Sequence, residues 1–275
     1  EQRQAAIESY NLAIKYNPND AKAYNNKGVC LDKLGQYQEA IKSYNLAIKY
    51  NPNLADAYYN KGVCLDKLRQ YQEAIKSYNL AIKYNPNYAK AYNNKGVCLS
   101  KLEQWQAAIE SYNLAIKYNP NYAKAYNNKG VCLDKLGQYQ EAIESYNLAI
   151  KYNPNYADAY YNKGVCLGKL EQRQAAIENY NLAIKYNPND ADAYYNKGVC
   201  LYKLGQLQKA IENFDLAIKY KPDLAVSYVY KGVCLYELGQ FQEAIENFDL
   251  AIKYDPNNVE AYKLINILKR KIAGI

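Results

Sequence analysis

The stretch Ala123 to Tyr156, AKAYNNKGVCLDKLGQYQEAIESYNLAIKYNPNY, carries the pattern that decides the fold. Copies of it begin every 34 residues, and the copy at Val259 is degraded. A fixed period of about 20 to 50 residues indicates stacked structural repeats, each contacting only its neighbours. We therefore expect a single solenoid over residues 1–275, composed of a half repeat (1–20), seven full repeats (21–54, 55–88, 89–122, 123–156, 157–190, 191–224 and 225–258) and a C-terminal capping helix (259–275).

Each repeat contains two helical patterns, and we number its residues as places 1 to 34. In the first part of the quoted copy, small and apolar residues recur at helical spacing: Ala125, Tyr126, Gly130, Cys132, Leu133 and Leu136. After a turn at Gly137, a second stripe follows the i, i+3, i+4, i+7 pattern: Tyr139, Ala142, Ile143, Tyr146, Ala149 and Ile150. All eight prolines occupy the place of Pro154, where proline ends the second helix. The sequence predicts an all-α chain of helix–turn–helix units.

A 34-residue helical pair with an aromatic residue, then Gly, then Ala-x3-aromatic and a closing Pro resembles the tetratricopeptide repeat (TPR). The residues that carry the resemblance in the quoted copy are Tyr126, Gly130, Ala142, Tyr146, Ala149 and Pro154. The resemblance implies a right-handed superhelical solenoid of stacked antiparallel helix pairs. Place 7 departs from the family, because Lys129 and its equivalents stand where the family has Leu. We expect each such lysine to pack its stem and to lift its ammonium group into water.

The charge and the cysteines describe the setting of the chain. The net charge of +8 comes mostly from lysines that recur in every repeat. Because nucleic-acid binding is favoured by a clustered basic patch and not by charge spread evenly along the chain, a nucleic-acid partner is not expected. The seven cysteines all stand at place 10. Helices pack ~8–10 Å apart, whereas a disulfide needs Cα atoms ~4.4–6.8 Å apart, so we expect buried, reduced thiols. This predicts an intracellular, cytoplasmic protein, with association with the cytoskeleton or a large assembly left open.

Nothing in the sequence points to catalysis. Histidine is absent, and the glycines are isolated rather than grouped in a phosphate-binding loop. We expect no enzymatic activity, no cofactor and no metal site, and no apolar run approaches the ~20 residues of a membrane span. Because the chain opens at Glu1 partway through a repeat, we expect it to be a piece of a longer protein. A regulatory arm of a larger enzyme is therefore an alternative function.

The resemblance implies a binding surface on the first helices, which line the concave face of TPR arrays at places 2, 5, 6, 9, 12 and 13. Place 6 carries an asparagine row: Asn26, Asn60, Asn94, Asn128, Asn162 and Asn196. A carboxamide both donates and accepts hydrogen bonds, so such a row suits the backbone of an extended peptide. The alternative is a solvated row that was copied when the repeat was duplicated.

Places 2 and 5 vary between repeats, and they share one patch of helix surface. Three repeats combine a lysine with an asparagine: Lys22 with Asn25, Lys90 with Asn93 and Lys124 with Asn127. Three combine an aspartate with a tyrosine: Asp56 with Tyr59, Asp158 with Tyr161 and Asp192 with Tyr195. We expect these residues to set the register and specificity of a ligand of mixed charge. Shuffling of two ancestral modules would produce the same alternation.

The last repeats become aromatic where the asparagine row stops. Tyr202 and Tyr236 occupy place 12, and Tyr230 replaces the asparagine of place 6. Aromatic side chains are favoured anchors at interfaces, so these tyrosines are candidates for a specificity pocket. Drift of terminal repeats is the alternative interpretation.

The second helices carry a leucine at place 26, nearly opposite their apolar stripe. These leucines include Leu114, Leu148 and Leu182, and they predict a convex contact with another protein, or partial cover by the next repeat. The clamp that some TPR proteins use for an acidic chaperone C-terminus is not expected, since Val29 and its equivalents replace the asparagine of place 9. The sequence thus predicts a non-catalytic scaffold for a protein or extended peptide, with structural packing into an assembly as the rival function.

Overall fold

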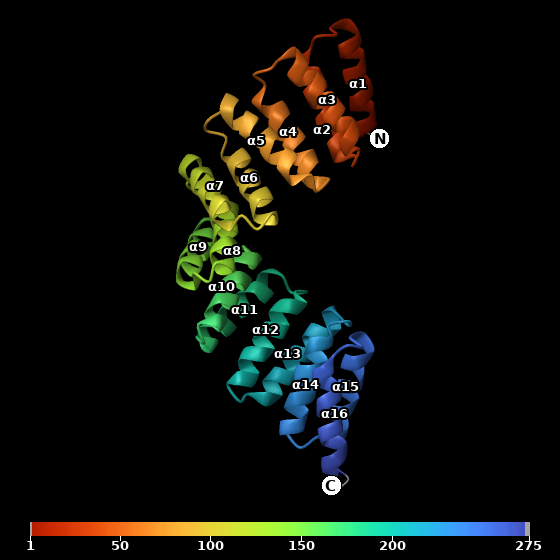
Figure 1. The fold of residues 1–275 in the computed structure, drawn as a ribbon, viewed down its shortest axis with the longest axis vertical. Helices are drawn as coiled ribbons and strands as arrows, with labels where there is room; N and C mark the ends of the chain where they lie inside the picture. Colours follow the sequence, from red (N-terminus) through yellow and green to blue (C-terminus); the bar gives the residue numbers. More distant parts are fainter. Residues whose placement is uncertain (1, 273–275) are drawn as a thin grey trace. The chain divides into compact units, whose positions relative to one another are not determined.

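The computed structural model describes residues 2–272, which form sixteen α-helices (Figure 1). They fall into two compact units, Glu1–Gln138 and Tyr139–Ile275, which we describe separately. The first unit contains α1 (Gln2–Tyr16), α2 (Ala21–Lys33), α3 (Tyr37–Tyr50), α4 (Ala55–Lys67), α5 (Tyr71–Tyr84), α6 (Ala89–Lys101), α7 (Trp105–Tyr118) and α8 (Ala123–Lys135). The second contains α9 (Tyr139–Tyr152), α10 (Ala157–Lys169), α11 (Arg173–Tyr186), α12 (Ala191–Lys203), α13 (Leu207–Tyr220), α14 (Ala225–Glu237), α15 (Phe241–Tyr254) and α16 (Val259–Ile272).

The predicted all-α fold of stacked antiparallel helix pairs is confirmed. Within each unit, the first helix of a repeat packs on its own second helix and on the first helix of the next repeat, as α4 packs on α5 and α6. The capping helix α16 packs on α15, and the predicted residues 273–275 lie outside the described chain. That residues 1–275 form a single body stays a prediction. No helix among residues 2–272 combines the length and apolar character that crossing a bilayer requires.

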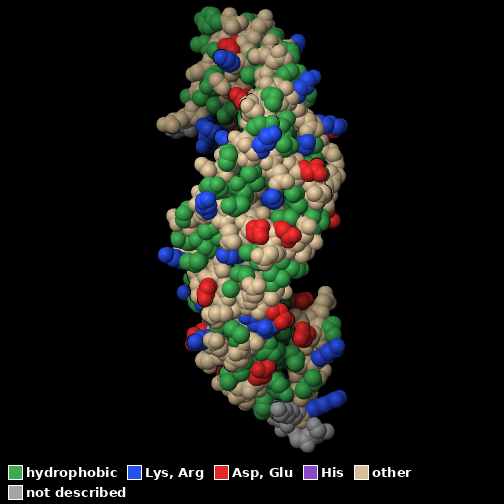
Figure 2. Space-filling model, turned by 90° about the vertical axis from the view of Figure 1, so that its left-hand side faces the viewer, with side chains coloured by type: hydrophobic (Ala, Val, Ile, Leu, Met, Phe, Trp, Pro, Cys, Tyr) green, Lys and Arg blue, Asp and Glu red, His purple; other side chains and the backbone are tan. Residues whose placement is uncertain are grey.

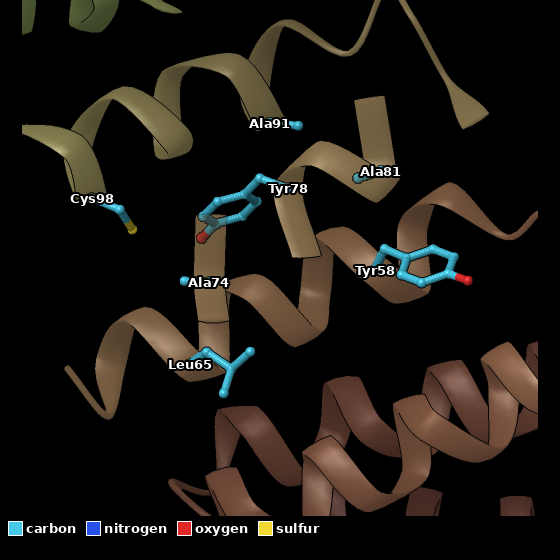
Figure 3. Close-up of a cluster of buried hydrophobic side chains, with 7 residues drawn as sticks. All are labelled: Tyr58, Leu65, Ala74, Tyr78, Ala81, Ala91 and Cys98. Atoms are coloured by element: carbon cyan, nitrogen blue, oxygen red, sulfur yellow. The ribbon is translucent and has the colours of Figure 1, made fainter. Parts of the chain in front are cut away.

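The core of each repeat forms where a glycine meets an aromatic ring. A Cβ atom added to Gly62 of α4 would lie 2.6 Å from Cε1 of Tyr78, far inside van der Waals contact. Figure 3 shows the ring of Tyr78 lying between α4 and α6. Ala74 and Ala81, on either side of this tyrosine along α5, are completely buried. The small residues therefore allow three helix backbones to approach one ring.

A second contact closes the outer edge of the repeats. The tyrosine of place 4 stacks on the tyrosine of place 30, as Tyr58 does on Tyr84 with ring centroids 5.5 Å apart. The hydroxyl group of Tyr58 donates a hydrogen bond to the carbonyl of Pro52 at 3.1 Å. Tyrosine can make this bond through its hydroxyl group, which ties the first helix to the loop that precedes it.

The lysines of place 7 are half-buried, and burial lowers the pKa of Lys61, Lys95, Lys129, Lys163 and Lys197. Lys61 does not lift its ammonium group only into water, because its Nζ donates to Oδ1 of Asn45 in the preceding repeat at 2.8 Å. Lys231 makes the equivalent contact with Asp215 at 2.6 Å. The family's apolar contact at this place is thus replaced by a polar bond between repeats.

The thiols lie on the first helices, and none of the seven forms a disulfide. Cys64, Cys98, Cys132, Cys166 and Cys234 have no exposed surface, Cys200 is 6% exposed and Cys30 is half-buried. Burial, together with the nearby Asp32 carboxylate, raises the pKa of Cys64 to about 12. The expectation of buried, unbridged cysteines is confirmed for all of them except the half-buried Cys30.

The turn between the helices of a repeat requires a left-handed residue at place 15. Gly35, Gly137, Gly205 and Gly239 have φ between 72° and 79°, whereas Arg69, Glu103 and Glu171 adopt φ of 58° to 61° at the same place. A residue with a Cβ atom pays roughly 1–2 kcal/mol for this conformation. Three repeats therefore carry strain that the other turns avoid.

We predict that Glu103→Gly stabilises the chain by up to about 1 kcal/mol, because glycine adopts the left-handed conformation without steric cost. The reverse change, Gly137→Glu, should destabilise it by a similar amount. Urea unfolding followed by circular dichroism measures both. Gln104→Gly, one residue further at φ −84°, is the control and should lower stability. Stabilisation by the control, or no difference between the first two variants, would contradict the strain.

We also predict a ranking of thiol reactivity at pH 8. Cys30 should react first with iodoacetamide, then Cys200, and the fully buried thiols last, because a raised pKa leaves little thiolate and burial blocks the reagent. Mass spectrometry of peptides after timed labelling measures the order. All seven cysteines should react alike in denaturant. Equal native rates for Cys30 and Cys98 would show that the core opens.

Candidate functional site

The candidate site is the surface of the first helices that carries places 2, 5, 6, 9, 12 and 13, which we name the first-helix face. In the first unit α2, α4, α6 and α8 lie side by side, and in the second α10, α12 and α14 do so. The place 2 residues are all exposed: Lys22, Asp56, Lys90, Lys124, Asp158 and Asp192. Basic and acidic side chains are interspersed on the side of the molecule that Figure 2 shows.

The asparagine row is held by hydrogen bonds between repeats. In the first unit, Nδ2 of Asn60 donates to Oδ1 of Asn25 at 3.1 Å, and Nδ2 of Asn128 donates to Oδ1 of Asn93 at 3.1 Å. Asn94 donates in the same way to the hydroxyl oxygen of Tyr59 at 3.2 Å. These three place 6 amides are therefore oriented by the place 5 side chain of the preceding repeat.

This arrangement differs from both interpretations of the row that we considered from the sequence. Those were a peptide-binding ladder and a solvated row, and the bond between repeats is a third role. The sequence could have shown it only through the pairing of place 5 with place 6 at a separation of 35 residues, one more than the repeat. Place 5 always holds an acceptor where the row continues, either an asparagine or a tyrosine.

The place 5 residues do not all face solvent. Asn93 has no exposed surface and Asn127 is 6% exposed, so these two position their neighbours rather than reach a ligand. Nδ2 of Asn93 also donates to Oδ1 of Asn94 at 3.1 Å. At the start of the row, Asn26 is exposed and accepts a long bond of 3.4 Å from Asn25.

Asp56 and Tyr59 have a partner that the sequence did not reveal. The ring of Tyr88, from the loop before α6, lies 4.9 Å from that of Tyr59, and its hydroxyl group donates to Oδ1 of Asp56 at 2.9 Å. Burial and the Asp56 carboxylate raise the pKa of Tyr88, so the phenol stays protonated as the donor. This predicted specificity pair is therefore covered in part by the protein itself.

In the second unit, Asn196 continues the pattern by donating to the hydroxyl oxygen of Tyr161 at 3.1 Å. Asn162 is half-buried one repeat earlier. The exposed Asp158 and Asp192 lie near Asp190. Burial and these two like charges raise the pKa of Asp190, although the hydrogen bond that its carboxylate accepts from the Ala193 amide lowers it. The start of α12 is therefore an acidic part of the first-helix face.

Two of the three tyrosines named in the last repeats, Tyr202 and Tyr230, pack against each other. The ring of Tyr230 packs against Tyr195 and Tyr202 at 5.8 and 5.9 Å, in edge-to-face geometry. Burial and Glu237, which accepts a 2.8 Å bond from Tyr202, raise the pKa of that tyrosine to about 12. Tyr236 instead packs against Phe241 at 5.7 Å.

Sequence reasoning missed a hollow in the second unit. It is an open cavity of about 280 Å³ between α10, α11 and α12, lined by Val165, Gly168, Lys169, Arg173, Tyr180, Asn196, Val199, Cys200 and Lys203. The sequence offered one signal for this cavity, because repeat 157–190 differs from the other repeats at two places. Gly168 stands at place 12, where three other repeats have Asp, and Arg173 stands at place 17, where five of the other full repeats have an aromatic residue.

The place 26 leucines lie on the second helices. Leu46, Leu80 and Leu114 of the first unit are 37–38% exposed, and so are Leu148 and Leu250 of the second, whereas Leu182 is half-buried. Each leucine is thus partly covered by its neighbours and partly open to solvent.

Three solved structures illustrate what the fold is similar to. YrrB, described as a TPR protein with an unusual peptide-binding site, matches with a TM-score of 0.59 and 29% identity over 70% of this chain and 98% of YrrB. MamA matches with a TM-score of 0.56 and 26% identity over 60% of this chain and 96% of MamA. PilF of Pseudomonas aeruginosa, at 19% identity and a TM-score of 0.68, covers 76% of this chain and 95% of its own and shows the fold alone.

The family comparison uses the sequence instead. No curated protein matches it. A tetratricopeptide repeat model matches residues 21–54, 55–88, 89–122, 123–156, 191–224 and 225–258, a TPR repeat model matches 167–205, and another tetratricopeptide repeat model matches 145–178. Since these matches cover most of the described repeats, the chain belongs to the tetratricopeptide repeat family.

Proposed function

We propose that this chain is a non-catalytic scaffold that holds an extended peptide segment of a protein partner against its first-helix face. Proteins built from TPR repeats are interaction scaffolds and are usually non-catalytic, and YrrB is described as having a peptide-binding site. In the proposal, the amides of Asn26, Asn60, Asn94, Asn128, Asn162 and Asn196 bond the backbone of the peptide.

One observation carries the proposal: the amides of the row are held in fixed orientations by bonds of 3.1–3.2 Å between repeats. A carboxamide has two N–H groups and an oxygen with two lone pairs. The bond between repeats uses one N–H group of Asn60, Asn94 and Asn128, so a second N–H group remains for a peptide. At Asn196 the second N–H group donates to the carbonyl of Asp192 at 2.9 Å, so its oxygen is what remains. Groups that are already ordered lose less entropy on binding, which favours affinity.

The exposed place 2 residues would select the peptide. Lys22, Lys90 and Lys124 of the first unit favour acidic side chains in the segment that they face. Asp158 and Asp192 of the second unit favour basic side chains. We assign the exposed residues a direct role, and the buried Asn93 and Asn127 the role of positioning the row.

The peptide hypothesis is tested by selecting a random linear peptide library on the full chain and measuring the selected peptides by fluorescence polarisation. We predict that Asn94→Ala combined with Asn128→Ala weakens binding about tenfold or more, as the loss of one or two hydrogen bonds implies. The control is Asn45→Ala on α3, which removes the bond between repeats that Asn45 accepts from Lys61 and leaves the first-helix face unchanged.

The double variant removes two bonds between repeats and the control removes one, so they should lose about 2 and about 1 kcal/mol of stability, and only the asparagine variant should lose the peptide. Selection of no peptide by the wild-type chain would contradict the proposal. So would peptides that bind the double variant as tightly as the wild type.

A second candidate is packing of two copies of the chain through the place 26 leucines, which the 37–38% exposure of Leu46, Leu80 and Leu114 favours. We predict that Leu80→Lys with Leu114→Lys dissociates such a dimer, because two charges would be buried without partners. Light scattering after gel filtration measures the mass. Gln72→Lys with Gln106→Lys adds the same charge at exposed places on α5 and α7 as the control. A wild-type chain that is monomeric at all concentrations would exclude this candidate.

A further inference from the structure

An ion pair joins the ends of two neighbouring first helices in the first unit. Lys67, at place 13 of its repeat, lies 2.7 Å from the Asp32 carboxylate at place 12 of the repeat before. Its ammonium group also lies over the ring of Tyr37 at place 17, 5.0 Å from the centroid. The cation therefore has an anionic partner and an aromatic partner, both supplied by the preceding repeat.

Repeat 157–190 removes both partners from the following lysine. Lys203 is equivalent to Lys67, but the residues at the partner positions are Gly168 and Arg173. In the described part of the chain, the ammonium group of Lys203 has neither an ion pair nor a hydrogen bond. A cation thus replaces the aromatic ring, and an empty space replaces the carboxylate.

The space left by Gly168 is the cavity of about 280 Å³ described above, well beyond the roughly 10–15 Å³ at which a cavity first holds a water molecule. A Cβ atom added to Gly168 would lie 3.9 Å from the hydroxyl oxygen of Tyr180 and 4.0 Å from Sγ of Cys200. An aspartate at this place therefore has room to point into the cavity toward Cys200, as Asp32 points toward Cys64 of the next repeat, 3.4 Å from its Sγ atom.

Arg173 does not make the hydrogen bond that Arg3, the other arginine at place 17, makes. The segment EQRQAAIE occurs twice, and in the first copy Nη1 of Arg3 donates to the carbonyl of Lys33 at 2.9 Å. In the second copy, Nε of Arg173 is buried and makes no hydrogen bond with any described residue. The nearest carboxylate is that of Glu171, which is 77% exposed and lies 3.4 Å from Nη2.

Lys169, Arg173 and Lys203 thus line one cavity, and the buried Nε–H donor of Arg173 is left without an acceptor among the described residues. A buried donor without a partner costs about 1–3 kcal/mol, and two like charges repel each other. An oxyanion in the cavity would satisfy both, since a guanidinium group binds carboxylate and phosphate oxygens through several N–H groups.

We propose that the cavity between α10, α11 and α12 is a binding site for an oxyanion, a carboxylate or phosphate group, held by Arg173 and Lys203. Asn196 of the asparagine row lines the same cavity, so an anion there lies beside the peptide path. That the anion is a side chain of the bound peptide rests on the proposed function. The site itself does not.

The other charged groups near the cavity affect its affinity for an anion. Lys169 lines it, but its ammonium group lies over the Tyr139 ring, 5.0 Å from the centroid. Glu171 competes with the anion for Arg173. Cys200 also lines the cavity, and Arg173 and Lys203 partly offset the burial that raises its pKa. Its thiol therefore reports whether the cavity is occupied.

The test measures alkylation of Cys200 in the full chain against increasing concentrations of inorganic phosphate or of acetate. At ten times the dissociation constant of the bound anion, the rate should fall about tenfold, because only the empty cavity admits the reagent. Cys30, which is outside the cavity, should keep its rate at matched ionic strength. Protection by phosphate alone identifies a phosphate site, and protection by acetate as well identifies a carboxylate site.

Two variants, Arg173→Tyr and Gly168→Asp, introduce the residue types that other repeats have at places 17 and 12. Arg173→Tyr should weaken the anion about tenfold or more, as expected for a lost charge-assisted hydrogen bond, and Gly168→Asp should abolish its protection of Cys200. Glu171→Gln should strengthen the anion, and Lys67→Gln, at the equivalent place of a repeat with its own aspartate, should leave it unchanged. Calorimetry with phosphate gives the affinities independently of the thiol.

Equal anion affinity in the wild type and in Gly168→Asp would overturn the site, and so would the absence of protection by both anions. Failure of the proposed function is distinguishable, because it would leave phosphate or acetate binding intact while no linear peptide is selected. If the anion site and the proposed function are both correct, peptides with a phosphoserine or a glutamate facing the cavity should bind Arg173→Tyr more weakly than the wild type. Peptides without an anionic residue should bind both equally.

Discussion

The close contact between a helical glycine and an aromatic ring is the constraint on which the other contacts of a repeat depend. A Cβ atom on Gly28, Gly96 or Gly232 would come within 2.5–2.6 Å of the ring at place 24, so any larger residue forces the helices apart. Glycine costs a helix roughly 0.5–1 kcal/mol relative to alanine. Its use in seven repeats shows that burial of the ring outweighs this cost.

Once the helices are set at this distance, polar side chains join successive repeats at three levels of the first helix. Asn60 bonds Asn25, Lys61 bonds Asn45 and Lys67 pairs with Asp32. The surface available to a ligand is therefore already a network of internal bonds. A peptide can bond only the donors and acceptors that these internal bonds leave unused. More of them remain where a repeat lacks one of the bonding side chains.

The sequence predicted the helices, their ends and the family, because each of these depends on residues within one repeat. It also placed Asn94 and Asn128 on a common face. It did not reveal that Asn93 is buried, that Tyr88 donates a hydrogen bond to Asp56, or that Arg173 and Lys203 line one cavity. The last two depend on side chains that are 32 and 30 residues apart in the sequence and that belong to different helices or loops.

The sequence by itself determined the repeat, its two helices and its small-residue core, since the period, the prolines and the glycine–aromatic pairs are local patterns with one packing solution. The tertiary structure decided which polar groups remain for a partner. A hydrogen bond consumes donors and acceptors only when two side chains come within about 3 Å, and that distance is set by how one repeat stacks on the next. The row of asparagines is visible in the sequence, but the atoms that it leaves free are a property of the stack.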